Sequence, residues 1–170
     1  MITKEEFLEK YKRYNLTDDQ FSGKERRIYS LDLRGLTEIP KGFNPVVSGS
    51  LYLNDLIEIP EGFKPVVSSN LVLSRLISIP EGFNPEVGYD LNLMRLTSIS
   101  EGFNPVVGRD LFLNSLTSIP EGFNPKVGGD LYLHSLVEIP ENWNPSKVKG
   151  NIYIDSVSID IELKIMNFEI

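Results

Sequence analysis

The segment from Leu111 to Asp130 reads L-F-L-N-S-L-T-S-I-P-E-G-F-N-P-K-V-G-G-D, and its pattern recurs with a 20-residue period on both sides. Six copies align from Leu31 to Gly150, with no gap needed between Leu31 and Val127. Every copy has Leu at its first, third and sixth positions, Ile at the ninth, an aromatic residue at the thirteenth and Pro at the fifteenth. Self-similarity at a fixed period of this length is the signature of a repeat protein.

Composition sets the broad class of the chain. It has 170 residues, of which 41% are hydrophobic, and it has no Cys. These values are typical of one globular domain rather than a disordered tail, and they exclude a disulfide framework. All 11 Pro residues stand at the tenth or fifteenth position of the repeat. The prolines therefore mark its period.

The charge and the absence of long apolar runs limit the partners and the location. A formal net charge of -7 argues against direct nucleic-acid binding through a broad surface and favours a basic protein as partner. No apolar run reaches the length of about 18 residues that crosses a bilayer, and the N-terminus lacks the apolar stretch of a signal peptide. We therefore expect no membrane association and a cytoplasmic location.

The repeat predicts a stack of coils. Within each copy L-x-L has the alternation of a short strand, whereas Pro and Gly in I-P-E-G-F-N-P prevent a regular helix. One such coil cannot bury its own Leu residues, but stacked coils bury them as continuous ladders. We therefore predict a parallel β-solenoid with short strands and irregular returns. A partial seventh copy, Ile152, Tyr153, Ile154 and Val157, is displaced by one residue because 146–148 contains an extra position.

The flanking segments are predicted to cap the stack. Thr3 with Glu6 fits a capping box before an amphipathic helix over 4–14, and Thr17 with Gln20 fits a second helical turn. The predicted divisions are a helical cap at 1–30, six to seven repeats at 31–157 and a capping strand at 158–170. That last strand could cap its own solenoid or pair with a second molecule, so either a monomer or a homodimer is expected.

The combination of L-x-L, I-P and E-G at a 20-residue period resembles the short, Pro-containing leucine-rich repeats of bacterial and phage proteins. The Asn that this family places three residues after the second strand Leu is replaced here by Leu in every copy, at Leu36 for example. Another group must therefore satisfy the backbone amides of that turn. The resemblance implies an inhibitor of a host defence protein, or an adaptor, acting in the host bacterial cytoplasm if the chain is phage-encoded.

The sequence offers little for catalysis. It has one His, His134, at a position that varies between copies, and it has no G-x-S-x-G motif. Asp90, Asp110 and Asp130 end successive copies, but a single Asp in each copy gives too few oxygens for calcium. We read each Asp as a turn former whose carboxylate accepts from nearby backbone amides. We therefore expect no catalytic residue, no metal site and no cofactor, and we regard an enzyme as the least favoured alternative.

The outward positions of the strands are the first candidate binding surface. The second and fourth positions vary between copies while the inward positions stay constant, and aromatic side chains gather there. Exposed aromatic residues interleaved with Asn and His are typical of protein interfaces, although strand propensity also favours Tyr and Phe. Arg75, Arg95 and Arg109 could add contacts at the rim. The candidate protein-binding residues are Tyr52, Asn54, Asn92, Met94, Phe112, Asn114, Tyr132, His134 and Tyr153.

The eleventh position carries the second candidate surface. In stacked coils its carboxylates would lie side by side, with Lys41 at the start of the column. Either the repeat simply copies a good turn, or the column forms an acidic ridge that imitates the phosphates of a nucleic acid. The residues of this acidic column are Glu61, Glu81, Glu101, Glu121 and Glu141.

Overall fold

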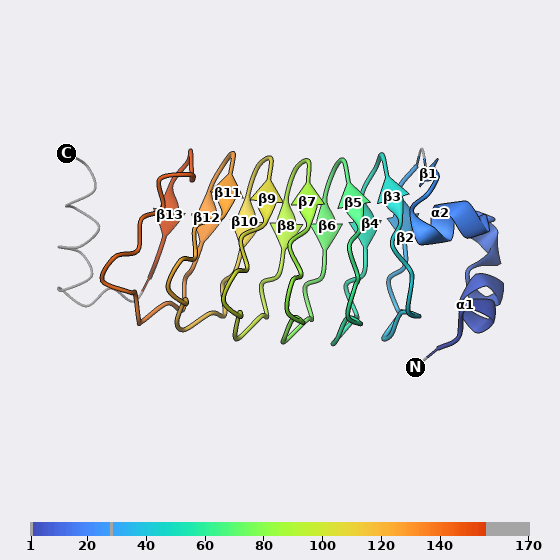
Figure 1. Ribbon diagram of the computed structural model, residues 1–170, viewed down its shortest axis with the longest axis horizontal. Coiled ribbons are helices and arrows are strands. Elements are labelled where there is room, and N and C mark those ends of the chain that lie inside the picture. The colour runs from blue at the N-terminus through green and yellow to red at the C-terminus, as the bar shows by residue number, and fades with distance from the viewer. Residues whose placement is uncertain (1, 28, 156–170) are drawn as a thin grey trace.

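The computed structural model describes residues 2–27 and 29–155, and they form a parallel β-solenoid (Figure 1). Successive coils stack along the long axis of the molecule, with the N-terminal helices at one end. The predicted fold class is therefore confirmed. Val157 and the predicted strand at 158–170 lie outside the described residues.

The L-x-L segments form a seven-stranded parallel sheet. Leu111 pairs with Leu91 on one side and with Leu131 on the other, so equivalent residues of neighbouring coils lie in register. Leu131 pairs with Ile152, one residue beyond the 20-residue period, which confirms the insertion predicted at 146–148. In chain order the strands are β2 Leu31–Asp32, β4 Leu51–Tyr52, β6 Leu71–Val72, β8 Leu91–Asn92, β10 Leu111–Phe112, β12 Leu131–Tyr132 and β13 Ile152–Tyr153.

The return of each of the first five coils holds a second strand that was not predicted from the sequence. It follows the Pro at the fifteenth position, and Pro fixes an extended backbone at the point where the inward Val begins to pair. The N-terminal cap supplies the first strand of this sheet, because Arg26 pairs with Val46. The six strands are β1 Arg26–Arg27, β3 Val46–Val47, β5 Val66–Val67, β7 Glu86–Val87, β9 Val106–Val107 and β11 Lys126–Val127.

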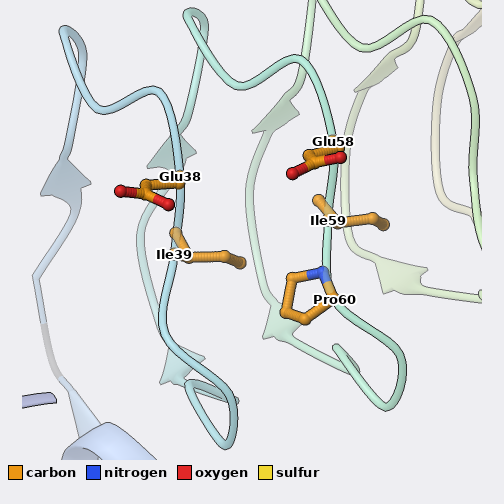
Figure 2. A pocket seen from close by; sticks show the side chains of 5 residues that line it. All are labelled: Glu38, Ile39, Glu58, Ile59 and Pro60. Atoms are coloured by element: carbon orange, nitrogen blue, oxygen red, sulfur yellow. The ribbon is translucent and has the colours of Figure 1, made fainter. Parts of the chain in front are cut away.

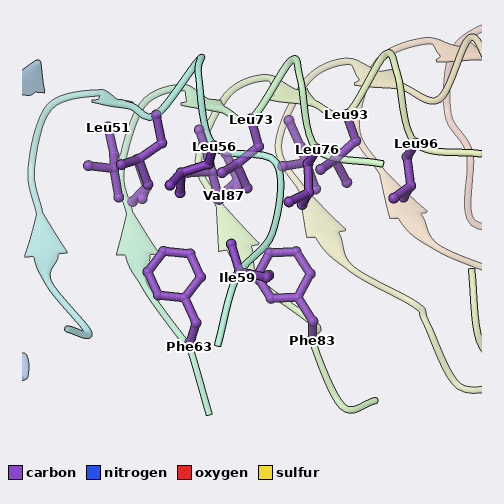
Figure 3. Packing of buried hydrophobic residues seen from close by; sticks show 14 of the residues in the cluster. Leu51, Leu56, Ile59, Phe63, Leu73, Leu76, Phe83, Val87, Leu93 and Leu96 are labelled. Atoms are coloured by element: carbon purple, nitrogen blue, oxygen red, sulfur yellow. The ribbon is translucent and has the colours of Figure 1, made fainter. Parts of the chain in front are cut away.

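The inward side chains form continuous ladders (Figure 3). Every Leu at the first, third and sixth positions is at most 1% exposed. The Phe rings at the thirteenth position stack from coil to coil, with 6.1 Å between the centroids of Phe63 and Phe83. Trp143 ends this ladder, and its Nε1 donates to the Phe123 carbonyl at 2.8 Å. The repeat is therefore constant within the chain where side chains are buried.

The N-terminal helices cover the first coil. The Thr3–Glu6 capping box is present at the start of α1 Lys4–Lys10, and Thr17 accepts from the Gln20 amide at the start of α2 Asp18–Ser22. The predicted helix over 4–14 is shorter than expected, because α1 ends at Lys10 and a 3-10 turn, η1 Lys12–Tyr14, follows it.

The cap packs on the core through aromatic rings. The Phe7 side chain is fully buried, and its ring centroid lies 4.9 Å from that of Phe43 and 5.7 Å from that of Phe21. Since Phe43 begins the Phe ladder, α1 closes the end of the hydrophobic core that the first coil would otherwise expose.

The turn that lacks the family's Asn is satisfied by its own backbone. The Leu36 amide donates to the Leu33 carbonyl at 3.1 Å, and the same contact recurs in the next five coils. An Asn ladder does exist elsewhere, at the fourteenth position. There Asn84 Oδ1 accepts from the Asn104 amide at 2.6 Å, and Asn104 Oδ1 accepts from the Asn124 amide at 2.5 Å.

Candidate protein-binding face

The second and fourth positions of the coils form one surface, which we call the outer face. It lies on the side of the seven-stranded sheet opposite the buried Leu ladders, because neighbouring residues of a strand point to opposite sides. Most of its side chains are half-buried against their neighbours, and Met94 and Tyr153 are exposed. All nine residues predicted to bind protein lie on this face: Tyr52, Asn54, Asn92, Met94, Phe112, Asn114, Tyr132, His134 and Tyr153.

Three rings of the outer face stack into what we call the aromatic row. The centroids of Phe112 and Tyr132 lie 4.6 Å apart, and those of Tyr132 and Tyr153 lie 4.9 Å apart. Their planes differ by only 9° and 11°. Rings held this way lose little conformational entropy when a partner docks, which is why rigid aromatic side chains are frequent anchors at interfaces.

Polar groups flank the aromatic row. His134 Nδ1 lies 2.7 Å from Asp155 Oδ1, and the His134 ring lies 5.8 Å from that of Tyr132. Burial of the Tyr132 hydroxyl, together with the negative charges of Asp130 and Asp110, raises the pKa of Tyr132. Tyr132 is therefore a neutral hydroxyl near pH 7, able to donate as well as accept a hydrogen bond.

The N-terminal end of the outer face carries charges that the sequence analysis did not include among the binding residues. Arg34 forms an ion pair with Asp32, and its guanidinium carbon lies 5.9 Å from the centroid of the Tyr52 ring. Hydrogen bonding from the Arg34 side chain lowers the pKa of Asp32 to about 2. Tyr14 of the cap also donates to the Asp32 carbonyl. The alternation of the strand predicted that these residues point outward, but not that they pair.

Smaller side chains occupy the middle of the outer face. Asn92 Oδ1 accepts from the Met94 amide at 3.3 Å, and Asn54 Nδ2 donates to Ser74 Oγ at 3.3 Å. Asn114 is half-buried. Met94 is the exposed apolar residue of this stretch, with 40% of its surface accessible. The face therefore runs from a charged end, through a largely polar middle, to an end where the aromatic row lies beside His134 and Asp155.

The three Arg residues predicted at the rim differ in their surroundings. Arg75 Nη1 lies 3.1 Å from Asp55 Oδ1, so its charge is already paired within the chain. Arg95 and Arg109 are exposed. Arg95 and Arg109 can therefore bind a carboxylate of a partner directly, whereas Arg75 would first have to give up its ion pair with Asp55.

The acidic column lies at a different turn of the coil. Glu61, Glu81, Glu101, Glu121 and Glu141 are all exposed, as is Lys41 at the start of the column. A shallow groove near its N-terminal end is lined by Glu38, Ile39, Glu58, Ile59 and Pro60 (Figure 2). The carboxylates of Glu38 and Glu58 come from equivalent positions of neighbouring coils, so this groove adds acidic groups that the sequence analysis did not consider.

Residues 2–27 and 29–155 contain no group of three or more His, Asp or Glu side chains that could hold a metal ion. None of their helices is long and apolar enough to span a membrane. Comparison of the chain with protein-family models, with curated proteins and with solved structures found no match. The resemblance to leucine-rich repeats and the function it implies therefore stay predictions.

Proposed function

We propose that this chain is a non-enzymatic protein-binding module and that the outer face is its docking surface. The observation that carries the proposal is the aromatic row, in which Phe112, Tyr132 and Tyr153 stand stacked on a sheet whose opposite side is fully buried. A rigid scaffold that presents partly exposed aromatic side chains favours recognition of another protein over chemistry on a small molecule.

Variation along the chain supports the same proposal. The first, third and sixth positions are Leu in every coil because each one is buried. The second position, which lies between two of these Leu residues in the strand, changes from Asp32 to Val72 to Phe112. Freedom from packing permits the differences, and a shaped partner surface gives them a use.

The resemblance to phage-type repeat proteins extends the proposal to a role. We propose an inhibitor or adaptor that works in the cytoplasm by covering a surface of its target, with no cofactor and no membrane contact. This step rests on the family analogy and not on particular residues.

Paired substitutions test the outer face. Replacing Phe112 and Tyr132 together with Ala removes two adjacent rings of the aromatic row without touching the buried ladders. We expect capture of the partner from a host lysate to fall at least tenfold by quantitative mass spectrometry, because losing two interface anchors costs about 2 kcal/mol or more. The melting temperature should change by no more than a few degrees.

Matched variants make that experiment decisive. Tyr89 is 52% exposed and lies outside the outer face, so Tyr89→Ala should leave capture unchanged. Capture that survives the Phe112→Ala and Tyr132→Ala pair, or is lost equally with Tyr89→Ala, would contradict the assignment of the docking surface.

The acidic column supports a second candidate function, the imitation of nucleic acid. Five exposed carboxylates in successive coils present a row of like charge, in a part of the coil where neighbouring Phe63 and Phe83 rings lie 6.1 Å apart. A basic channel that normally holds nucleic acid would attract such a row, and this attraction would weaken steeply with salt.

Replacing Glu81, Glu101 and Glu121 together with Gln in the same capture experiment separates the two candidates. Loss of capture here, with retention in the Phe112 and Tyr132 variant, would favour mimicry.

A further inference from the structure

The outer face is complementary to itself when its order is reversed. Along the second position, Val72 and Phe112 are equally far from Asn92, as are Tyr52 and Tyr132. Along the fourth position, Arg34 and Asp155 each lie three coils from Met94. When the order of the coils is reversed, each of these pairs places an apolar side chain opposite another apolar side chain, or a positive charge opposite a negative charge. The remaining pairs have polar groups on both sides, and they are Asn54 with His134, Ser74 with Asn114 and Asp32 with Tyr153.

A two-fold axis that relates two copies of the chain would bring these pairs of side chains into contact. If the axis lies in the plane of contact and runs along β8, it reverses the order of the coils but keeps the direction of the strands. Each column then faces the same column of the second copy, and the first coil opposes the seventh. Such isologous pairing is the commonest way in which identical chains associate.

We propose that the outer face docks a second copy of this chain in antiparallel orientation, with Met94 facing Met94 at the centre and Arg34 facing Asp155 of the second copy at each end. The inference rests on the proposed role of the outer face as a docking surface, and it names the chain itself as a partner. It differs from a dimer through the C-terminal strand, because it uses the side chains of the sheet rather than its edge.

The charges at the two ends are placed for this contact. The Arg34 side chain is 64% exposed and that of Asp155 is 68% exposed, although each already has a partner in its own chain. Docking would link Asp32, Arg34, Asp155 and His134 into one alternating network at each end. Arg34 with Asp32 and His134 with Asp155 are the groups that face one another there, so the orientation is fixed by four charged or titratable side chains.

The size of the face predicts the strength of the dimer. Seven strands spaced by about 4.8 Å give a length of about 30 Å, and the four residues from the first to the fourth position of a coil give a width of about 13 Å. The contact would therefore cover about 400 Å² per copy, about half of the roughly 800 Å² that each partner contributes to a standard stable interface. We expect a weak dimer, with a dissociation constant of about 100 μM.

A charge swap in the full chain tests the proposal by sedimentation equilibrium from about 1 to 200 μM. Arg34→Glu places two acidic groups together at each end, and Asp155→Arg places two basic groups together. Each change alone should raise the dissociation constant about tenfold or more, and the two changes combined should restore it. Lys126→Glu reverses an exposed charge on the second sheet, away from the outer face, and should have no effect.

The absence of native Cys allows a second readout. Copies of residue 94 meet at the proposed axis, whereas copies of residue 54 would lie about 19 Å apart along the face, four coil spacings. A short bis-maleimide should therefore cross-link Met94→Cys to itself and not Asn54→Cys. Circular dichroism melts check that each variant remains folded.

The outcomes separate this inference from the proposed function. A chain that stays monomeric at the highest concentration, a combined variant no better than its parents, or equal cross-linking at 54 and 94 would overturn the antiparallel dimer. If capture of another protein still depends on Phe112 and Tyr132, the proposed function stands without the dimer. If the combined variant restores the dimer but the outer face binds no other protein, the antiparallel dimer stands and the proposed function is wrong.

Discussion

The residue that ends each coil joins it to the next coil. Asp110 Oδ1 accepts from the Asp130 amide at 2.8 Å, and Asp130 Oδ1 accepts from the Asn151 amide at 2.8 Å. The prediction that these carboxylates accept from nearby backbone amides is confirmed for the acceptor but not for the place of the donor. The donor lies a full repeat away in the sequence and becomes a neighbour only when the coils stack. Asn70 and Ser50 serve the same purpose with uncharged oxygens.

The negative charge of these Asp side chains should therefore stabilise the fold less than the hydrogen bond that their oxygen accepts. Asp110→Ala leaves the half-buried Asp130 amide without its acceptor, and we expect the free energy of unfolding to fall by about 1 to 2 kcal/mol. Asp110→Asn keeps an oxygen at the same atom, as Asn70 does naturally, and should cost less than half as much. Urea denaturation of both variants measures the difference, and equal losses would show that the carboxylate charge, not the hydrogen bond, stabilises the coil.

At the scale of the elements, the regular strands were predictable and the return strands were not. The L-x-L alternation identified the seven-stranded sheet and its inward side directly. In each of the first five coils the second sheet has only P-x-V, and at Glu86–Val87 and Lys126–Val127 its outward residue is charged. Such a short extended segment gives no period to recognise, so only stacking reveals it. The end of α1 at Lys10 was missed for the opposite reason, because the apolar stripe with helical spacing continues through Tyr11 and Tyr14.

In five of the six coils, the turn after the ninth position has a Gly with a positive φ, whereas the sixth coil has Asn142 there without one. Gly102 has a φ of +78° in a turn closed by the Phe103 amide and the Ser100 carbonyl, and open space surrounds the place of a Cβ atom. Gly102→Ala should thus cost about 1 kcal/mol through backbone strain alone, and Gly102→Asn should cost less, because Asn tolerates this region better. Denaturant unfolding measures both, and a larger loss for Asn than for Ala would contradict this explanation.

For the whole molecule, the 20-residue period determines which side chains share a surface. It was enough to place all nine candidate residues on one face, because the second and fourth positions of every coil fall in line. It could not give the parallel stacking of the aromatic row or the pairing of Arg34 with Asp32, since these depend on rotamers and on contacts between coils. The groove at Glu38 and Glu58 could not be predicted from the sequence for a similar reason, because its walls come from separate coils.

The central claim is that the chain advances by one coil with every repeat, so that equivalent positions lie in straight columns. Spin labels on Cys introduced at the exposed positions Lys41 and Glu141 measure this directly, because the chain has no other Cys. Five coil spacings place the two backbone sites about 24 to 32 Å apart, from the 4.8 Å between paired strands to the 6.1–6.5 Å between neighbouring Phe rings two residues further along each coil. Dilution with unlabelled protein removes distances between copies. Double electron–electron resonance should give one narrow distribution within a label's length of that range. A broad distribution centred at about 55 Å, as expected of a flexible chain between the two labels, would contradict the account.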